Sequence, residues 1–170
     1  IKMKIGILGG SFDPAHKGHL AISKEARKRF KLEKIIWAIT KKNPLKAESK
    51  TPISKKIKDC KKIIGLNSFI KVKFYENIIK SNKTIDLINY LKKNKNIEIF
   101  FLMGADNLIS FHKWHKSKLI SQKCNIIVFD RHGYKKNSLK SKTFKRLNNK
   151  TLTFVEFKKV NISSSQLRKI

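Results

Sequence analysis

Short apolar runs alternate along the chain with longer segments in which apolar and charged residues recur at helical spacing. The first apolar run, residues 4–8, ends at Gly9 and Gly10, which is the pattern of a buried parallel strand that stops at a glycine turn. Residues 17–30 then place Leu, Ala and Phe side chains on one helical face and Lys and Arg side chains on the other. The pattern predicts one strand–turn–helix unit.

Further strands are expected at intervals along the chain, at residues 34–40, 69–75, 97–103, 125–129 and 152–157. A loop from Lys41 to Pro52 is expected to lead into a helix, and Thr84 is predicted to cap another helix that runs to Lys92. Strands that alternate with helices predict a Rossmann-like, doubly wound α/β fold, with a mostly parallel sheet and helices on both faces. Because no Gly/Ser-rich or Pro-rich linker divides the chain, residues 1–170 are expected to form a single domain.

Polar residues that follow the predicted strands are the first candidates for a functional site, because ligands bind at the carboxyl ends of the strands in such sheets. These residues are 9–19, 43–46, 104–107 and Arg131.

The turn after the first strand has a composition that suits phosphate groups. Its glycines allow backbone N–H groups to approach an anion, and the helix that begins near His16 adds its positive end. His16 and His19 are three residues apart, so on a first helical turn their side chains project to the same side of the helix, with Gly18 between them. A lone histidine here would more often be a cap or a core residue. Two histidines can instead stabilise the charge that develops on an α-phosphate and on a leaving pyrophosphate.

Basic residues dominate the charge of the chain. The sequence has 41 Lys and Arg against 11 Asp and Glu, a formal net charge of +30, and such an excess often marks a protein that binds nucleic acid. The lysines are dispersed over nearly every segment, however, and Asn and Ile are also abundant, as AT-rich codon usage would produce. A solvated surface is therefore favoured, and a basic nucleic-acid-binding module is kept as an alternative.

The two cysteines, Cys60 and Cys124, lie far apart in the sequence. They lack the spacing of a zinc site or a disulfide framework, so two buried, reduced thiols are expected. The sequence has no recognisable signal peptide and no apolar run of membrane-spanning length. We therefore expect a cytoplasmic protein that does not bind a membrane. The oligomeric state is left open.

Two segments resemble the signatures of a known superfamily. Residues 10–19, Gly-Ser-Phe-Asp-Pro-Ala-His-Lys-Gly-His, resemble the first signature of the nucleotidyltransferases with a His-x-Gly-His motif. Residues 162–168, Ile-Ser-Ser-Ser-Gln-Leu-Arg, resemble the second signature of that superfamily, Ile-Ser-Ser-Thr-x-Ile-Arg. The order and the separation of the two segments also agree with the superfamily.

Three further segments resemble one branch of this superfamily, the bacterial nicotinate-nucleotide adenylyltransferases. Residues 103–108, Met-Gly-Ala-Asp-Asn-Leu, are followed by Trp114 and His115, and residues 83–86 and 43–46 resemble the Tyr-Thr-Ile-Asp stretch and the Pro-Pro-His-Lys loop of that family. The resemblance implies that nicotinate mononucleotide and ATP react to give nicotinate adenine dinucleotide and pyrophosphate. Mg²⁺ would be bound through the ATP phosphates, and no metal ligand from the protein is expected.

The resemblance also implies a role for each matching residue. The expected catalytic residues are His16, His19, Lys46 and Arg168. The expected ATP-binding residues are Gly10, Ser11, Phe12, His16, His19, Gly104, Asp106, Ser163, Ser164 and Arg168. The expected mononucleotide-binding residues are Lys46, Thr84, Trp114, His115 and Arg131. Trp114 would stack on the pyridine ring, and the backbone amides of Thr84 and His115 would hold its carboxylate.

Simpler interpretations remain for three of these residues. Trp114 would then belong to the core, Asp106 would cap a helix that begins at Asn107, and Lys46 would be one more solvated lysine.

The chain also departs from the family at two positions. Leu45 stands where the family has a histidine, and Lys83 stands where the family has an aromatic residue.

A phosphopantetheine adenylyltransferase is the alternative within the same enzyme class, because it shares the first signature. The Gly-Ala-Asp-Asn segment at residues 104–107 and the downstream Trp114 and His115 favour the pyridine nucleotide instead.

Overall fold

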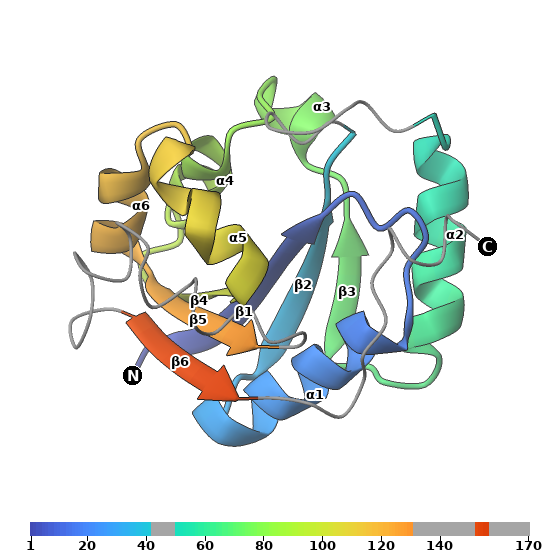
Figure 1. Cartoon of the computed structure of the whole chain (residues 1–170), viewed down its shortest axis with the longest axis horizontal. Coiled ribbons are helices and arrows are strands. Elements are labelled where there is room, and N and C mark those ends of the chain that lie inside the picture. The colour runs from blue at the N-terminus through green and yellow to red at the C-terminus, as the bar shows by residue number, and fades with distance from the viewer. Residues whose placement is uncertain (42–49, 131–151, 157–170) are drawn as a thin grey trace.

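Six parallel strands form one sheet in a computed structural model that describes residues 1–41, 50–130 and 152–156 (Figure 1). The strands are β1 (Met3–Gly10), β2 (Lys34–Ile39), β3 (Ile70–Lys73), β4 (Ile97–Gly104), β5 (Asn125–Asp130) and β6 (Leu152–Glu156). They lie in the order β3-β2-β1-β4-β5-β6, and every pairing between neighbours is parallel. This is the strand order of the doubly wound Rossmann-like fold, so the predicted fold class is confirmed.

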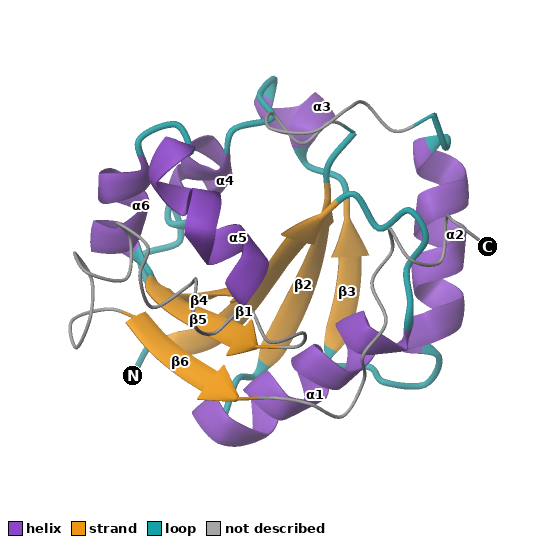
Figure 2. Cartoon of the chain, viewed as in Figure 1, coloured by secondary structure: helices purple, strands orange, loops and turns teal. Residues whose placement is uncertain are grey.

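Helices cover both faces of this sheet (Figure 2). The helical elements are α1 (Lys17–Phe30), α2 (Ile53–Ile64), α3 (Glu76–Ile79), α4 (Thr84–Leu91), α5 (Ala105–Ser110), the 3-10 turn Phe111–Lys113 and α6 (Ser117–Lys123). One core cluster joins the sheet to α1 and α2 through Ile22, Ala26 and Cys60. The other joins it to α4 and α6 through Ile88 and Ile120. Each face of the sheet is therefore buried under its own layer of helices.

The close packing of β2 and of the connection that precedes it against β1 explains a glycine in the middle of β1. A Cβ atom added at Gly6 would lie 2.9 Å from Leu32 Cδ1 and 3.2 Å from Ile35 Cγ1. Both neighbours are buried, so a larger residue at this position would force them to shift.

Several sequence-based expectations about individual elements need correction. Thr84 is not the cap of α4, because the helix begins at Thr84 itself and Lys83 is the N-cap, without a side-chain capping bond. Tyr75 does not extend β3, because it is the N-cap of α3. The short elements α3, α6 and the 3-10 turn were not predicted, since three to seven residues carry too little periodicity.

No helix in the described ranges is long and apolar enough to cross a membrane.

Candidate active site

A cavity of about 260 Å³ lies where the strand order reverses between β1 and β4. It is lined by Gly9, Gly10, Thr40, Asn82, Lys83, Thr84, Phe101, Asn107, Lys113, Trp114 and His115. Gly9 and Gly10 are the last residues of β1, and Thr40 directly follows β2. The carboxyl ends of strands that diverge from a switch point form the usual ligand crevice of this fold. The cavity therefore occupies the place that the sequence predicted for the site.

Two histidines begin α1, beside the end of β1. His16 is the N-cap, and its Nδ1 accepts the backbone N–H of Gly18 at 3.0 Å. His19 Nδ1 accepts the backbone N–H of His16 at 3.1 Å, so the two side chains form a reciprocal capping box. The centres of the two rings are 4.0 Å apart. The expectation that they project to the same side is confirmed, and His16 is at the same time the helix cap of the simpler interpretation.

This capping box determines which ring nitrogens can donate hydrogen bonds. A nitrogen that accepts a backbone N–H cannot carry a proton itself, so the neutral form of each ring holds its hydrogen on Nε2. The backbone thus fixes the tautomer and the orientation of His16 and His19 together. Both rings are preorganised as Nε2–H donors, which is the property that phosphate oxygens require.

Two buried aromatic rings, those of Phe12 and Trp37, pack against His19. The rings of Phe12 and Trp37 stack with centres 5.2 Å apart, and the ring of His19 lies 4.5 Å from Phe12. Trp37 Nε1 donates to Ser23 Oγ at 2.8 Å, and Ser23 Oγ donates to the carbonyl of His19 at 2.8 Å. Neither Trp37 nor Ser23 was predicted as a site residue, because both look like ordinary core positions of a strand and a helix.

Phe12 has an unusual backbone conformation for an aromatic residue. Its φ angle is +48°, in the left-handed region, and its ring is 2% exposed. Such a conformation costs about 1–3 kcal/mol and persists where the surroundings enforce it. The ring faces Trp37 and His19, so these neighbours hold Phe12 in this conformation.

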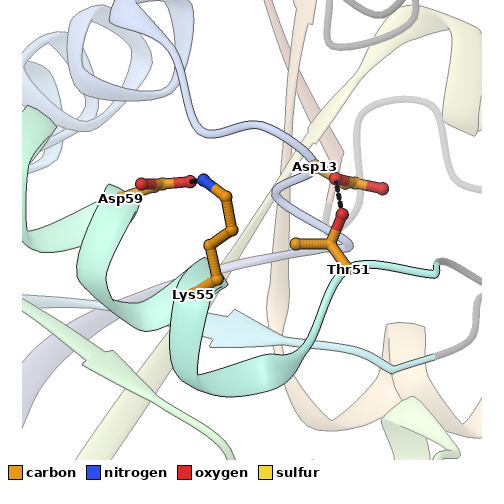
Figure 3. Close-up of polar contacts among 4 residues, drawn as sticks. All are labelled: Asp13, Thr51, Lys55 and Asp59. Atoms are coloured by element: carbon orange, nitrogen blue, oxygen red, sulfur yellow. Dashed lines mark hydrogen bonds and ion pairs between the residues drawn. The ribbon is translucent and has the colours of Figure 1, made fainter.

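A hydrogen bond ties the turn before α1 to the segment before α2. Thr51 Oγ1 donates to Asp13 Oδ1 at 2.6 Å (Figure 3). The ion pair between Lys55 and Asp59 in the same view, with 2.9 Å between Nζ and Oδ2, lies within α2. An exposed pair of this kind stabilises its helix by only about 0.3–0.5 kcal/mol. The Asp13–Thr51 bond therefore links the turn before α1 to the start of α2.

The start of α4 forms another part of the cavity wall. Ser81 Oγ accepts the backbone N–H of Lys83 at 3.0 Å and donates to Asp86 Oδ2 at 2.5 Å. These bonds fix the loop that precedes Thr84. As the first residue of α4, Thr84 has a backbone N–H that the helix does not use for its own hydrogen bonds.

Trp114 packs against the core and also lines the cavity. Its ring meets Phe101 edge-on, with centres 5.9 Å apart and an interplanar angle of 86°, and lies 5.1 Å from Phe111. The side chain is half-buried and also lines the cavity. The core thus holds the indole ring in place while part of it faces the ligand space.

Asp106 does not cap a helix that begins at Asn107. Helix α5 begins at Ala105, Gly104 is its N-cap, and Asp106 lies in the first turn. The capping interpretation is therefore wrong.

The residues around the cavity make its wall cationic. Lys83, Lys113 and His115 line it, and none of its described lining residues carries a carboxylate. Glu76, which lines an adjoining cavity of about 40 Å³, accepts the backbone N–H of Lys41 at 3.0 Å, and burial raises the pKa of its carboxyl group. The ammonium group of Lys56, a residue that is 1% exposed, donates to the carbonyl of Thr40 at 3.3 Å.

Both cysteines are buried free thiols, as expected. Burial raises the pKa of Cys60 and of Cys124 to about 12. Neither is therefore a nucleophile near neutral pH.

Five of the sequence-predicted site residues lie outside the described residues: Lys46, Arg131, Ser163, Ser164 and Arg168. The same holds for Leu45, the first departure from the family pattern. Their roles stay predictions.

Solved structures of similar fold come from enzymes of pyridine nucleotide metabolism. The nicotinic acid mononucleotide adenylyltransferase of Plasmodium falciparum, solved as a complex with NaAD, superposes with a TM-score of 0.77 at 21% identity, over 99% of this chain and 83% of that chain. Its complex with APC gives a TM-score of 0.78, over 98% and 83% of the two chains. At this level of identity, the likeness supports the fold.

Sequence relatives give the family. The model of the cytidylyltransferase-like family matches residues 7–170. A Pelagibacter ubique (strain HTCC1062) protein named "probable nicotinate-nucleotide adenylyltransferase" is 68% identical over 99% of this chain and 94% of its own length. A Rhizobium johnstonii protein of the same name is 33% identical over 82% of this chain and 71% of its own. The chain therefore belongs to the cytidylyltransferase-like family and, within it, to the nicotinate-nucleotide adenylyltransferases.

Proposed function

We propose that the chain transfers the adenylyl group of ATP to the phosphate of nicotinate mononucleotide, a step in NAD biosynthesis. A phosphate oxygen of the mononucleotide attacks the α-phosphorus of ATP, the bond from that phosphorus to the β-phosphate oxygen breaks, and pyrophosphate leaves. The product that keeps both nucleotides is nicotinate adenine dinucleotide. The observation that carries the proposal is the pair of oriented imidazole rings, 4.0 Å apart, at the first turn of α1.

Catalysis in this proposal rests on positioning and on charge stabilisation. The attacking phosphate is largely ionised near neutral pH, so no general base is needed. The Nε2–H groups of His16 and His19 donate to oxygens on which negative charge accumulates as pyrophosphate leaves, and the N-terminus of α1 adds its positive end. These donors act most strongly on the transition state, where that charge is largest.

The other ATP contacts are proposed from the family pattern. The backbone at Gly10, Ser11 and Phe12 would face the phosphates, and Gly104 and Asp106 would meet the ribose of the adenosine. Lys46, Ser163, Ser164 and Arg168 would close on the phosphates.

The mononucleotide is proposed to occupy the cavity beside β4. Trp114 would stack on the pyridine ring, and the backbone amides of Thr84 and His115 would donate to its carboxylate. This assignment is supported by the half-buried indole ring in the cavity wall and by the position of Thr84 at the start of α4. Lys46 and Arg131 would complete the contacts.

Mg²⁺ is proposed to arrive with the nucleotide. In the ranges that the structure describes, no group of three His, Cys, Asp or Glu side chains could hold a metal ion, so the triphosphate oxygens are the ligands that we propose. When bound, the ion would neutralise part of the triphosphate charge. A cytoplasmic location is also proposed, since both cysteines are free thiols.

The experiment that tests this function compares three acceptors in a pyrophosphate-release assay with ATP at near-physiological ionic strength. We expect nicotinate mononucleotide to exceed nicotinamide mononucleotide by at least about tenfold in kcat/KM, which corresponds to about 1.4 kcal/mol. The reason is that N–H groups directed at a carboxylate match an amide poorly. Equal efficiency for the two mononucleotides would overturn the assignment of the pocket. Turnover with phosphopantetheine but with neither mononucleotide would overturn the proposed function.

Trp114→Ala is expected to raise the KM of both mononucleotides by similar factors of about five to ten, because stacking does not distinguish an acid from an amide. Steady-state kinetics at saturating ATP measure both values. Trp114→Phe, which keeps a ring against Phe101 and Phe111, is the control for lost packing. An unchanged KM in the alanine variant would remove Trp114 from the ligand site.

A further inference from the structure

Lys83 occupies a fixed position in the cavity wall, directly before Thr84. Its backbone N–H is held by Ser81 Oγ at 3.0 Å, and its carbonyl accepts the N–H groups of Asp86 and Leu87 at 3.1 and 3.3 Å. The N-terminus of α4 is therefore satisfied by the backbone carbonyl of Lys83, and the side chain of Lys83 makes no capping bond. The side chain of Lys83 is available for another role.

No acidic side chain in residues 1–41, 50–130 and 152–156 forms an ion pair with Lys83. In the described part of the chain, the ion pairs are Arg29 with Glu25 and Lys55 with Asp59, and neither involves Lys83. Asp86, on the same first turn, already binds the hydroxyl of Ser81. Lys83 is half-buried as a residue and lines the cavity. A lysine in the cavity wall that forms no ion pair with the described acidic side chains favours the arrival of an anion in the cavity.

The neighbours of Lys83 indicate which anionic group it meets. The cavity lining includes Lys83, Thr84, Trp114 and His115 but neither of the two histidines of α1. Lys83 thus shares a wall with the aromatic ring and with the start of α4, and not with the imidazole donors. Lys83 therefore lies on the side of the cavity where the pyridine ring of a mononucleotide and the substituent of that ring would bind.

We propose that Lys83 is a specificity-determining residue that selects a mononucleotide with a carboxylate on its ring over one with a neutral amide. This inference rests on the proposed function and adds a charge to the amide donors proposed there. An ammonium group attracts a carboxylate through its full charge, and it interacts with an amide only as a dipole. The position where the chain departs from the aromatic residue of its family is therefore part of its substrate recognition.

Lys83→Gln tests the proposal by removing the charge while leaving the backbone capping of α4 in place. We expect kcat/KM for nicotinate mononucleotide to fall about tenfold, as for the loss of one partly buried charge-assisted contact. The value for nicotinamide mononucleotide should change less than about twofold, and Lys83→Arg should keep most of the preference. Calorimetric binding of both mononucleotides gives the same ratio without turnover.

Two other lysines serve as comparisons. Lys113→Gln removes a charge that lines the cavity but is exposed, so its effect on the acid-to-amide ratio should be smaller than that of Lys83→Gln. Lys118→Gln removes an exposed charge from α6, outside the cavity lining, and should leave the ratio unchanged. Added salt should reduce the ratio of the unmodified protein more than that of Lys83→Gln.

The possible outcomes separate this inference from the proposed function. If Lys83→Gln weakens both mononucleotides equally, the lysine contacts a group common to both, such as the phosphate, and the inference is wrong. If the variant keeps the full preference for the acid, the inference is also wrong, while turnover of nicotinate mononucleotide by the unmodified protein still supports the function. A fall in kcat/KM for nicotinate mononucleotide, with little change for nicotinamide mononucleotide, supports the inference.

Discussion

His19→Asn is expected to lower kcat by about 100-fold or more while the protein stays folded. Asn can place Oδ1 near the position of Nδ1, so it can still accept the backbone N–H of His16 in the capping box. It cannot replace the Nε2–H donor. Removal of one preorganised donor to a developing charge typically costs about 3 kcal/mol in the transition state. Single-turnover and steady-state kinetics, with circular dichroism to monitor folding, measure the effect.

His19→Gln is the matched control, because its amide N–H₂ can reach toward the position of Nε2, and a Gln at this position of a capping box can also accept the backbone N–H of His16. We therefore expect this variant to lose less than about 1 kcal/mol of unfolding free energy and to retain more activity than His19→Asn. Turnover of His19→Asn within a few-fold of the unmodified protein would show that the Nε2–H donor has no catalytic role.

Trp37→Ala is expected to lower the free energy of unfolding by about 3–5 kcal/mol, the range for loss of a large aromatic residue from a core. Trp37 is 0% exposed and stacks on Phe12. Its loss would also remove the N–H group that donates to Ser23 Oγ and the ring that stacks on Phe12, whose backbone is strained. Urea denaturation monitored by far-UV circular dichroism measures the change.

Trp37→Phe separates the two contributions of the indole ring. It keeps an aromatic ring in the stack and removes only the hydrogen bond to Ser23, so we expect a loss of about 1 kcal/mol plus a small packing term. If Trp37→Ala lost less than 1 kcal/mol, the stack would not support the turn that carries the histidines.

Much of the fold could be predicted from the sequence, because strands buried on both faces give apolar runs that are easily recognised. The run at residues 4–8 became β1, and the helical periodicity of residues 17–30 matches α1. Four-residue helix α3 shows the limit, since one turn has no measurable periodicity. The N-cap of α4 was misplaced at Thr84, one residue after the actual cap Lys83, because the hydroxyl that organises this loop belongs to Ser81.

The site was predictable in its residue types but not in its geometry. The spacing of His16 and His19 indicated that both rings project to one side, and the rings do lie together. The backbone bonds that fix their tautomer depend on the cap conformation at His16, which residue types do not specify. The support from Trp37 depends on the register between β1 and β2, where Leu8 pairs with Trp37. Such long-range contacts are set by the tertiary fold.

Isotope transfer tests most directly whether the phosphate of the mononucleotide attacks the α-phosphorus of ATP. Nicotinate mononucleotide with ¹⁸O in its phosphate is incubated with unlabelled ATP, and the products are analysed by mass spectrometry. In-line attack predicts that all of the label appears in nicotinate adenine dinucleotide and that pyrophosphate carries none. Labelled pyrophosphate, or release of AMP without a dinucleotide, would contradict adenylyl transfer to the mononucleotide.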